Sequence, residues 1–127
     1  MMGQEKRKVL ICDDSMFIRK KLRDLLETEF DCEVVEAGNG QEGITSYDQT
    51  RPEVVFMDIV MPVMDGIEAA EKIREMEAGS GKHVPIIAIT ANAMIGDKEI
   101  CLSSGIDDYI SKPFHPEMLL EKIRQLL

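Results

Sequence analysis

Residues 54–66 read VVFMDIVMPVMDG, a short apolar run that ends on a carboxylate and then turns. The run Val54–Met57 is apolar at every position, which is typical of a strand buried on both faces of a parallel sheet. Asp58 follows the run directly, and the pair Asp65-Gly66 marks a turn into a helix. This stretch therefore predicts a central strand that presents Asp58 at its carboxyl end.

The same alternation of apolar run and amphipathic stretch continues on both sides of this segment. Four further runs are predicted to be strands: Val9–Cys12, Glu33–Val35, Ile86–Ile89 and Tyr109–Ile110. Apolar residues at helical spacing lie between the runs, as at Ile18, Leu22, Leu25 and Leu26. A last apolar stripe runs from Leu119 to Leu127, and Pro116 suits the first turn of that helix. Strict alternation predicts right-handed βαβ units, and hence a doubly wound α/β domain with five strands and five helices.

Composition limits the class of protein. The 127 residues fit one domain spanning 1–127, with a flexible start at 1–7. Fifteen basic and twenty-four acidic residues give a net charge of −9, which argues against direct nucleic-acid binding. No apolar run approaches the roughly 20 residues that cross a bilayer, and no secretory segment is present, so we expect a cytoplasmic protein without membrane contact. The cysteines Cys12, Cys32 and Cys101 lack metal-site spacing and are expected to be buried free thiols.

Polar side chains follow four of the five predicted strands. Asp13 and Asp14 come after the first strand and Asp58 after the third, while Thr90 and Lys112 come after the fourth and fifth. Because the carboxyl ends of parallel strands share one edge of a sheet, these side chains are expected to converge on one crevice. The single histidines do not follow strand ends, and both are predicted to be surface residues: His83 and His115.

Three neighbouring carboxylates repel one another unless a cation lies between them. A set of oxygen ligands favours Mg²⁺ or Mn²⁺ over zinc, and magnesium often also binds phosphate oxygens. An aspartate can act as a nucleophile and form an aspartyl phosphate. Lys112 and the metal would then neutralise the phosphoryl oxygens, and the Thr90 hydroxyl would donate a hydrogen bond to one of them.

Four strings in this order resemble the signature regions of the response-regulator receiver family, across nearly the whole chain: LICDDS, VFMDIVMPVMDG, PIIAITANA and DDYISKP. The resemblance implies a flavodoxin-like sheet with strand order 2-1-3-4-5. It implies that Asp58 is phosphorylated by a partner's phosphohistidine. It also implies that Asp14 and Asp58 bind the metal directly, that Asp13 binds it mostly through water, and that Val60 offers its backbone carbonyl.

The resemblance carries further expectations about signalling. Thr90 and Tyr109 would form the conformational switch, and the Lys112-Pro113 peptide would be cis. The partners would be a sensor histidine kinase or histidine phosphotransfer protein and a downstream effector protein. The chain would be a signalling switch and not an enzyme with an external substrate, either a monomer or a dimer formed on phosphorylation.

Several alternatives remain open from the sequence. The string TANAM and the segment before Lys112 are most similar to receivers of hybrid sensor kinases, so the chain is either a standalone regulator or a domain of a hybrid kinase or longer regulator. An aspartate-nucleophile phosphohydrolase of the haloacid dehalogenase type would use similar chemistry, but it would carry DxD in place of Asp13-Asp14, and a cap segment. A flavin-binding protein is disfavoured because no phosphate-cradling loop follows the first strand.

Overall fold

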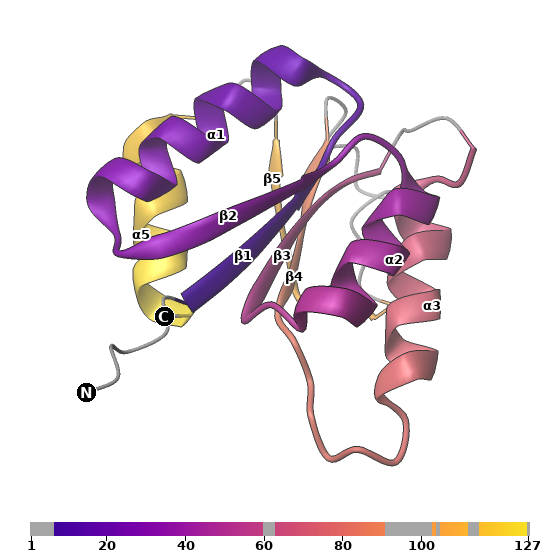
Figure 1. The fold of residues 1–127 in the computed structure, drawn as a ribbon. Coiled ribbons are helices and arrows are strands. Elements are labelled where there is room, and N and C mark those ends of the chain that lie inside the picture. Colours follow the sequence, from indigo (N-terminus) through magenta and orange to yellow (C-terminus); the bar gives the residue numbers. More distant parts are fainter. Residues whose placement is uncertain (1–6, 60–62, 91–102, 104, 112–114, 127) are drawn as a thin grey trace.

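The computed structural model describes residues 7–59, 63–90, 103, 105–111 and 115–126 (Figure 1). Strands and helices alternate along the chain in this order: β1 (Arg7–Cys12), α1 (Met16–Glu29), β2 (Cys32–Ala37), α2 (Gly40–Thr50), β3 (Val54–Asp58), α3 (Gly66–Glu77), β4 (Ile86–Thr90), β5 (Asp108–Ser111) and α5 (Pro116–Leu126). All strand pairs are parallel, in the order β2-β1-β3-β4-β5, which confirms the predicted topology. The helix predicted between the fourth and fifth strands lies outside the described residues.

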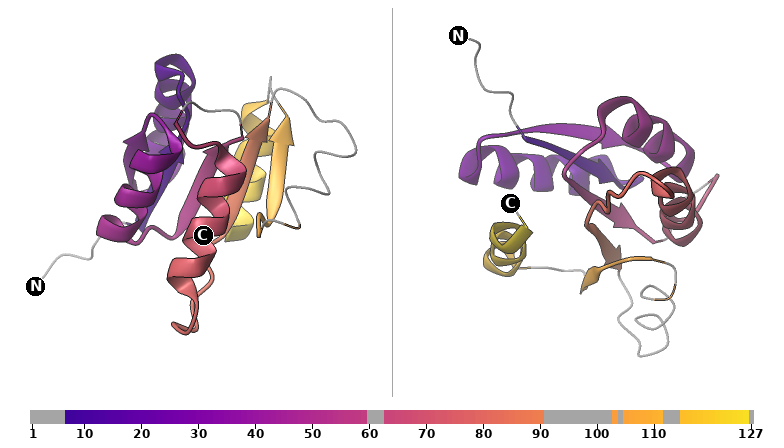
Figure 2. Two further views of the ribbon diagram at one scale, coloured as in Figure 1. Left: turned by 90° about the vertical axis from the view of Figure 1, so that its right-hand side faces the viewer. Right: turned by 90° about the horizontal axis from the view of Figure 1, so that it is seen from below.

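Helices cover both faces of the sheet. α1 and α5 lie on one face, and α2 and α3 lie on the other (Figures 1 and 2). Alternate residues of β1 therefore enter different cores, with Val9 and Ile11 facing α1 and α5 and with Leu10 and Cys12 facing α2 and α3. The run Val54–Met57 is fully buried, as its uninterrupted apolar sequence predicted.

Every predicted strand is longer than its apolar run. β1 begins at Arg7, so the prediction that Arg7 belongs to a flexible start is wrong. Ladder hydrogen bonds use the backbone, and polar residues can therefore extend a strand where their side chains reach a partner. Glu36 in β2 is such a case, because its carboxylate binds Arg19 at 3.0 Å and Arg23 at 2.6 Å.

Short polar side chains fix the starts of three helices. Each accepts a hydrogen bond from a backbone N–H of the first turn: Ser15 for α1, Asn39 for α2 and Asp65 for α3. α5 begins at Pro116 as predicted, but Leu126 at its end is 39% exposed and does not belong to the buried stripe. No helix in the described part of the chain is long and apolar enough to span a membrane.

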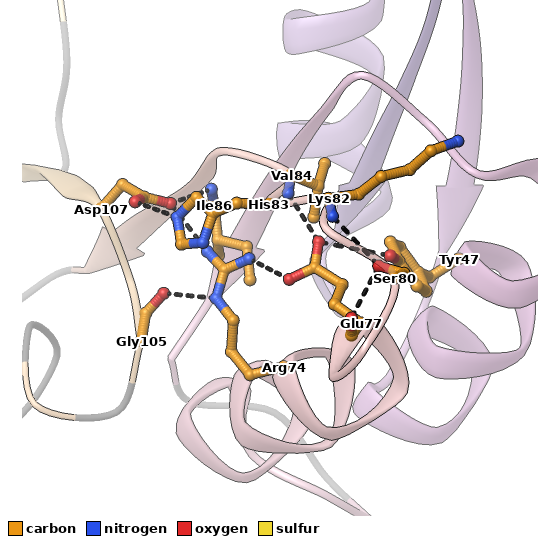
Figure 3. Close-up of polar contacts among 10 residues, drawn as sticks. All are labelled: Tyr47, Arg74, Glu77, Ser80, Lys82, His83, Val84, Ile86, Gly105 and Asp107. Atoms are coloured by element: carbon orange, nitrogen blue, oxygen red, sulfur yellow. Dashed lines mark hydrogen bonds and ion pairs between the residues drawn. The ribbon is translucent and has the colours of Figure 1, made fainter.

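A network of charged residues closes the amino edge of the sheet, where β4 and β5 begin (Figure 3). Arg74 binds Glu77 at 2.6 Å and Asp107 at 2.8 Å, and it is only 17% exposed. Glu77 also accepts the Tyr47 hydroxyl at 3.3 Å, and His83 Nε2 lies 2.6 Å from Asp107. Backbone groups complete the network: Val84 N–H donates to Glu77, Ile86 N–H donates to Asp107, and Gly105 carbonyl accepts from Arg74. His83 is an exposed residue at this edge, as predicted.

Candidate functional site

Three carboxylates meet at the carboxyl edge of the sheet. Asp13, Asp14 and Asp58 each offer an oxygen atom that lies within 4.8 Å of the other two. Asp13 is fully buried and Asp58 is 5% exposed, while Asp14 is exposed. Burial and mutual repulsion both disfavour three negative charges at this spacing, so the cluster is suited to a bound cation. The structure thus brings together the three acids that follow β1 and end β3.

The turn from β1 into α1 holds Asp13 in place. Its N–H donates to the Ala37 carbonyl at 3.1 Å, which continues the pairing of β1 with β2. Its Oδ1 accepts the Ser15 N–H at 2.9 Å, and Ser15 Oγ accepts the Ile18 N–H at 3.3 Å as the cap of α1. Arg19 donates to the Asp13 carbonyl at 2.5 Å. One carboxylate oxygen of Asp13 is therefore used to shape the turn.

Asp58 is held by the sheet and by the start of α3. It is the last residue of β3 and pairs with Ile89 of β4. Gly66 packs directly on its backbone, because a Cβ atom at position 66 would lie 2.9 Å from the Asp58 carbonyl carbon and closer still to its oxygen. The Gly66 N–H donates to the Ile59 carbonyl at 2.9 Å. The Asp65-Gly66 signal therefore marks a close approach as well as a turn.

Cys12 lies next to the cluster as a neutral thiol. It is fully buried, and burial first and the Asp13 charge second raise the pKa of the thiol well above its usual range. A thiol that keeps its proton is a poor metal ligand, because the thiolate is the form that binds. The cluster therefore offers oxygen ligands only, as the sequence predicted. Cys12 and Cys32 are buried, as predicted, and Cys101 lies outside the described residues.

The remaining predicted site residues are placed in part. Thr90 ends β4 and pairs with Ser111 of β5, so its backbone reaches the same edge as Asp58. Tyr109 in β5 is half-buried and packs against the core between the sheet and α2 and α3. Three predicted features lie outside the described residues: Val60, Lys112 and the Lys112-Pro113 peptide.

Sequence reasoning missed the residues that support the cluster through the backbone. Arg19 was not singled out, although its guanidinium binds the Asp13 carbonyl and also the Glu36 carboxylate. The sequence did contain one indication of this role: Arg19 lies one helical turn after Ser15, on the helix that follows the two acids. The role of Gly66 against Asp58 was hidden, because a turn signal does not say which atoms a glycine contacts.

Comparison with known proteins identifies the family. The model of the response regulator receiver domain matches residues 9–124. The chain belongs to the response-regulator receiver family. The chemotaxis protein CheY of Halobacterium salinarum is 40% identical to this receiver, over 95% of the chain and 97% of CheY. The hybrid signal transduction histidine kinase I of Dictyostelium discoideum is 41% identical over 92% of the chain, but the chain spans only 7% of that protein.

Solved receivers have the same fold. The receiver domain of a Pseudomonas aeruginosa sensor histidine kinase, with magnesium coordinated in its active-site cleft, has a TM-score of 0.84 and 32% identity, covering 95% of this chain and 97% of that one. The receiver of Saccharomyces cerevisiae Ssk1, crystallised with the histidine phosphotransfer protein Ypd1, has a TM-score of 0.85 and 32% identity, covering 98% and 91%. This chain is a receiver domain of a two-component system, a class of signalling switch similar to CheY and to the receivers of sensor kinases.

Proposed function

We propose that this receiver is phosphorylated on Asp58 by a phosphohistidine of a partner protein, and that the phosphoryl group switches its binding to a downstream effector. One observation carries the proposal. Asp13, Asp14 and Asp58 meet within 4.8 Å at the carboxyl ends of β1 and β3. The strand order reverses between these two strands, and open α/β sheets bind their ligands at such a point.

Magnesium is the cofactor that fits this cluster. Asp14, Asp58 and the backbone carbonyl of Val60 would bind it directly, and Asp13 mostly through water. All are hard oxygen donors, so Mn²⁺ would also fit. When bound, the ion would neutralise charge on the phosphoryl oxygens. The magnesium-bound receiver of the Pseudomonas kinase supports this assignment.

The chemistry of the chain is a phosphoryl transfer to a carboxylate. An oxygen of Asp58 attacks phosphorus, the bond from phosphorus to the histidine nitrogen breaks, and the imidazole leaves with the electron pair. Lys112 and the Thr90 hydroxyl would stabilise the phosphoryl oxygens. Thr90 and Tyr109 would then change position and alter the surface offered to the effector. The receiver would catalyse only its own phosphorylation and dephosphorylation.

Exposed apolar side chains near the acidic cluster support docking of a phosphodonor protein. Met16 and Phe17 begin α1, with only Ser15 between them and the two acids, and each is 75% exposed. Val63, in the loop that follows Asp58, is 81% exposed. Large apolar side chains exposed on one surface often mark a site of protein interaction. The complex of the Ssk1 receiver with Ypd1 supports a histidine phosphotransfer protein or histidine kinase as the partner.

Labelling with a small phosphodonor tests the phosphorylation site. Acetyl phosphate with Mg²⁺ should add one phosphoryl group to the wild-type protein, as measured by intact mass, and EDTA should prevent labelling. Asp58→Asn should abolish labelling, whereas Asp48→Asn, an exposed acid in α2, should label as the wild type does. An unlabelled wild-type protein, or an Asp58→Asn variant that labels normally, would exclude Asp58 as the acceptor.

Docking is tested with a protein donor. Phosphorylated Ypd1 serves as the probe, and Phe17→Ala should slow transfer from it by about tenfold or more, because exposed aromatic anchors often dominate an interface. The same variant should react with acetyl phosphate at the wild-type rate. Met118→Ala, which removes a half-exposed side chain from α5, is the control. Equal slowing with both donors would show that Phe17 acts on the site and not on docking.

A further inference from the structure

The first residue of α2 packs against the loop that follows Asp58. A Cβ atom at Gly40 would lie 2.8 Å from Met64 Cβ and 2.9 Å from the Met64 carbonyl carbon, and closer still to the carbonyl oxygen. Two of these atoms belong to the backbone, which cannot rotate out of the way as a side-chain end can. Position 40 therefore accepts no side chain unless the loop moves.

The other side of this loop is held by the start of α3. Gly66 packs on the backbone of Asp58 and Ile59, and its N–H donates to the Ile59 carbonyl. The loop thus has one fixed end beside the Asp58 backbone, and its far end, at Met64, rests on Gly40.

The backbone conformation of Val63 indicates strain in this loop. Its φ is 70°, in the left-handed region that a β-branched residue rarely adopts. Its side chain is 81% exposed, so no packing of that side chain explains the conformation. Such backbone strain persists only where neighbouring contacts impose it. Two such contacts flank Val63: Gly66 packs on the backbone of Asp58 and Ile59 before it, and Gly40 packs on the backbone of Met64 after it.

We propose that Gly40 is a positioning residue of the acidic cluster. By letting α2 contact the Met64 backbone, Gly40 fixes the loop after Asp58, and with it the approach of the Asp58 carboxylate to Asp13 and Asp14. The proposal rests on the proposed function, because it concerns the same site. A positioning role for Gly40 differs from a packing role. If Gly40 served packing alone, a side chain at position 40 would lower folding stability and leave Mg²⁺ binding unchanged.

The chain offers matched controls at two other glycines. At Gly43, in the same helix, a Cβ atom would lie 2.7 Å from Cys12 Sγ, so alanine there is crowded against a core side chain and not against the loop. At Gly38, just before α2, the nearest atoms would be 3.5 and 3.6 Å away, which are ordinary contacts. Gly43→Ala is thus the control for lost packing, and Gly38→Ala is the control for the substitution itself.

Magnesium affinity and folding stability are measured on the same variants, by isothermal titration calorimetry and by thermal unfolding. Gly40→Ala should weaken Mg²⁺ binding by about tenfold, as loss of a support behind metal ligands does, and should reduce labelling by acetyl phosphate in proportion. Gly43→Ala should lower the melting temperature and leave Mg²⁺ affinity within about twofold. Gly38→Ala should change neither.

A second substitution tests whether the loop transmits the effect. Val63→Gly removes the strain, so this single variant should have a raised melting temperature. Added to Gly40→Ala, it should restore only part of the lost Mg²⁺ affinity. If Gly40→Ala does not fold, the double variant is measured in its place and should bind Mg²⁺ more weakly than Val63→Gly alone.

Two results would overturn the role of Gly40: wild-type Mg²⁺ affinity in Gly40→Ala, or an equal loss of affinity in Gly43→Ala at an equal loss of melting temperature. Failure of the proposed function would look different, because the wild-type protein itself would then neither bind Mg²⁺ nor become labelled.

Discussion

Acidic residues gather at both edges of this sheet, but their surroundings differ. At the amino edge, Glu77 and Asp107 face cationic and hydrogen-bond-donating groups, among them Arg74 and the Tyr47 hydroxyl (Figure 3). At the carboxyl edge, the acids face one another within 4.8 Å. The first arrangement ties α3 to β4 and β5. The second places negative charges side by side, and a bound cation would relieve the repulsion between them.

The difference shows that acidic character alone does not mark a functional site. A carboxylate whose hydrogen bonds are satisfied by the fold contributes to folding, and its loss leaves a partner buried without compensation. A carboxylate placed beside other carboxylates adds repulsion to the folded state, whatever hydrogen bonds it also makes. The same substitution, from acid to amide, should therefore have opposite consequences at the two edges.

The largest expected effect is at the amino edge. Arg74→Met should lower the free energy of unfolding by about 3 kcal/mol, because it leaves the buried Glu77 carboxylate without its cation. Urea unfolding measures the loss. Lys20→Met, which breaks an exposed ion pair in α1, should lower it by less than about 0.5 kcal/mol. Mg²⁺ affinity should stay at the wild-type value in both variants, and a loss of affinity in Arg74→Met would mean that the two edges are not independent.

The double variant Arg74→Met/Glu77→Gln sharpens this result. It removes both charges of the pair, so it should be less destabilising than the sum of the two single substitutions. Additive effects would show that the ion pair contributes little to the stability of the amino edge.

The next effect is the response of stability to magnesium. At a concentration one hundred times its dissociation constant, Mg²⁺ should raise the free energy of unfolding of the wild-type protein by about 2.7 kcal/mol. Asp14→Asn should lose most of this gain, and it should not destabilise the metal-free protein, because it relieves repulsion within the cluster. Asp107→Asn should lower stability equally with and without Mg²⁺. Thermal unfolding in EDTA and in Mg²⁺ separates the two patterns, and a destabilised metal-free Asp14→Asn would contradict the comparison.

The carboxyl edge was predictable from the sequence, and the amino edge was not. Asp13, Asp14 and Asp58 follow apolar runs, and parallel topology then places them at one edge without any knowledge of side-chain contacts. Arg74 and Asp107 are 33 residues apart and follow no pattern that links them. No apolar pattern marks Glu77, the last residue of α3, yet it is buried. Its burial depends on three partners that only the folded chain brings together.

Contacts between backbones were equally hidden from the sequence. A glycine at the start of a helix, such as Gly40 or Gly66, can have either of two roles. It can allow an unusual backbone conformation, or it can leave room for a neighbouring backbone segment to pack closely. Only the positions of Met64 and Asp58 decide between these roles. The predicted strands were too short for a related reason. The pattern of apolar residues does not reveal the backbone pairing of charged residues such as Arg7 and Glu36.

The smallest expected effect tests the amino edge through pH. Burial first and the neighbouring Glu77 charge second raise the pKa of the Tyr47 hydroxyl above its ordinary value of about 10. Because the folded pKa is the higher one, the stabilisation is complete below pH 10 and is lost as pH rises through the folded pKa. The free energy of unfolding should therefore fall in this alkaline range, and the tyrosinate absorbance of Tyr47 should appear at a higher pH than that of free tyrosine.

The variant Tyr47→Phe tests this assignment. At neutral pH its free energy of unfolding should be about 1 kcal/mol lower, because Glu77 loses a hydrogen-bond donor, and above pH 10 it should fall less steeply than in the wild type. If the free energy of unfolding fell equally steeply with pH in Tyr47→Phe, other groups would govern alkaline unfolding. Tyr47 would then not contribute to the stability of the amino edge in this way.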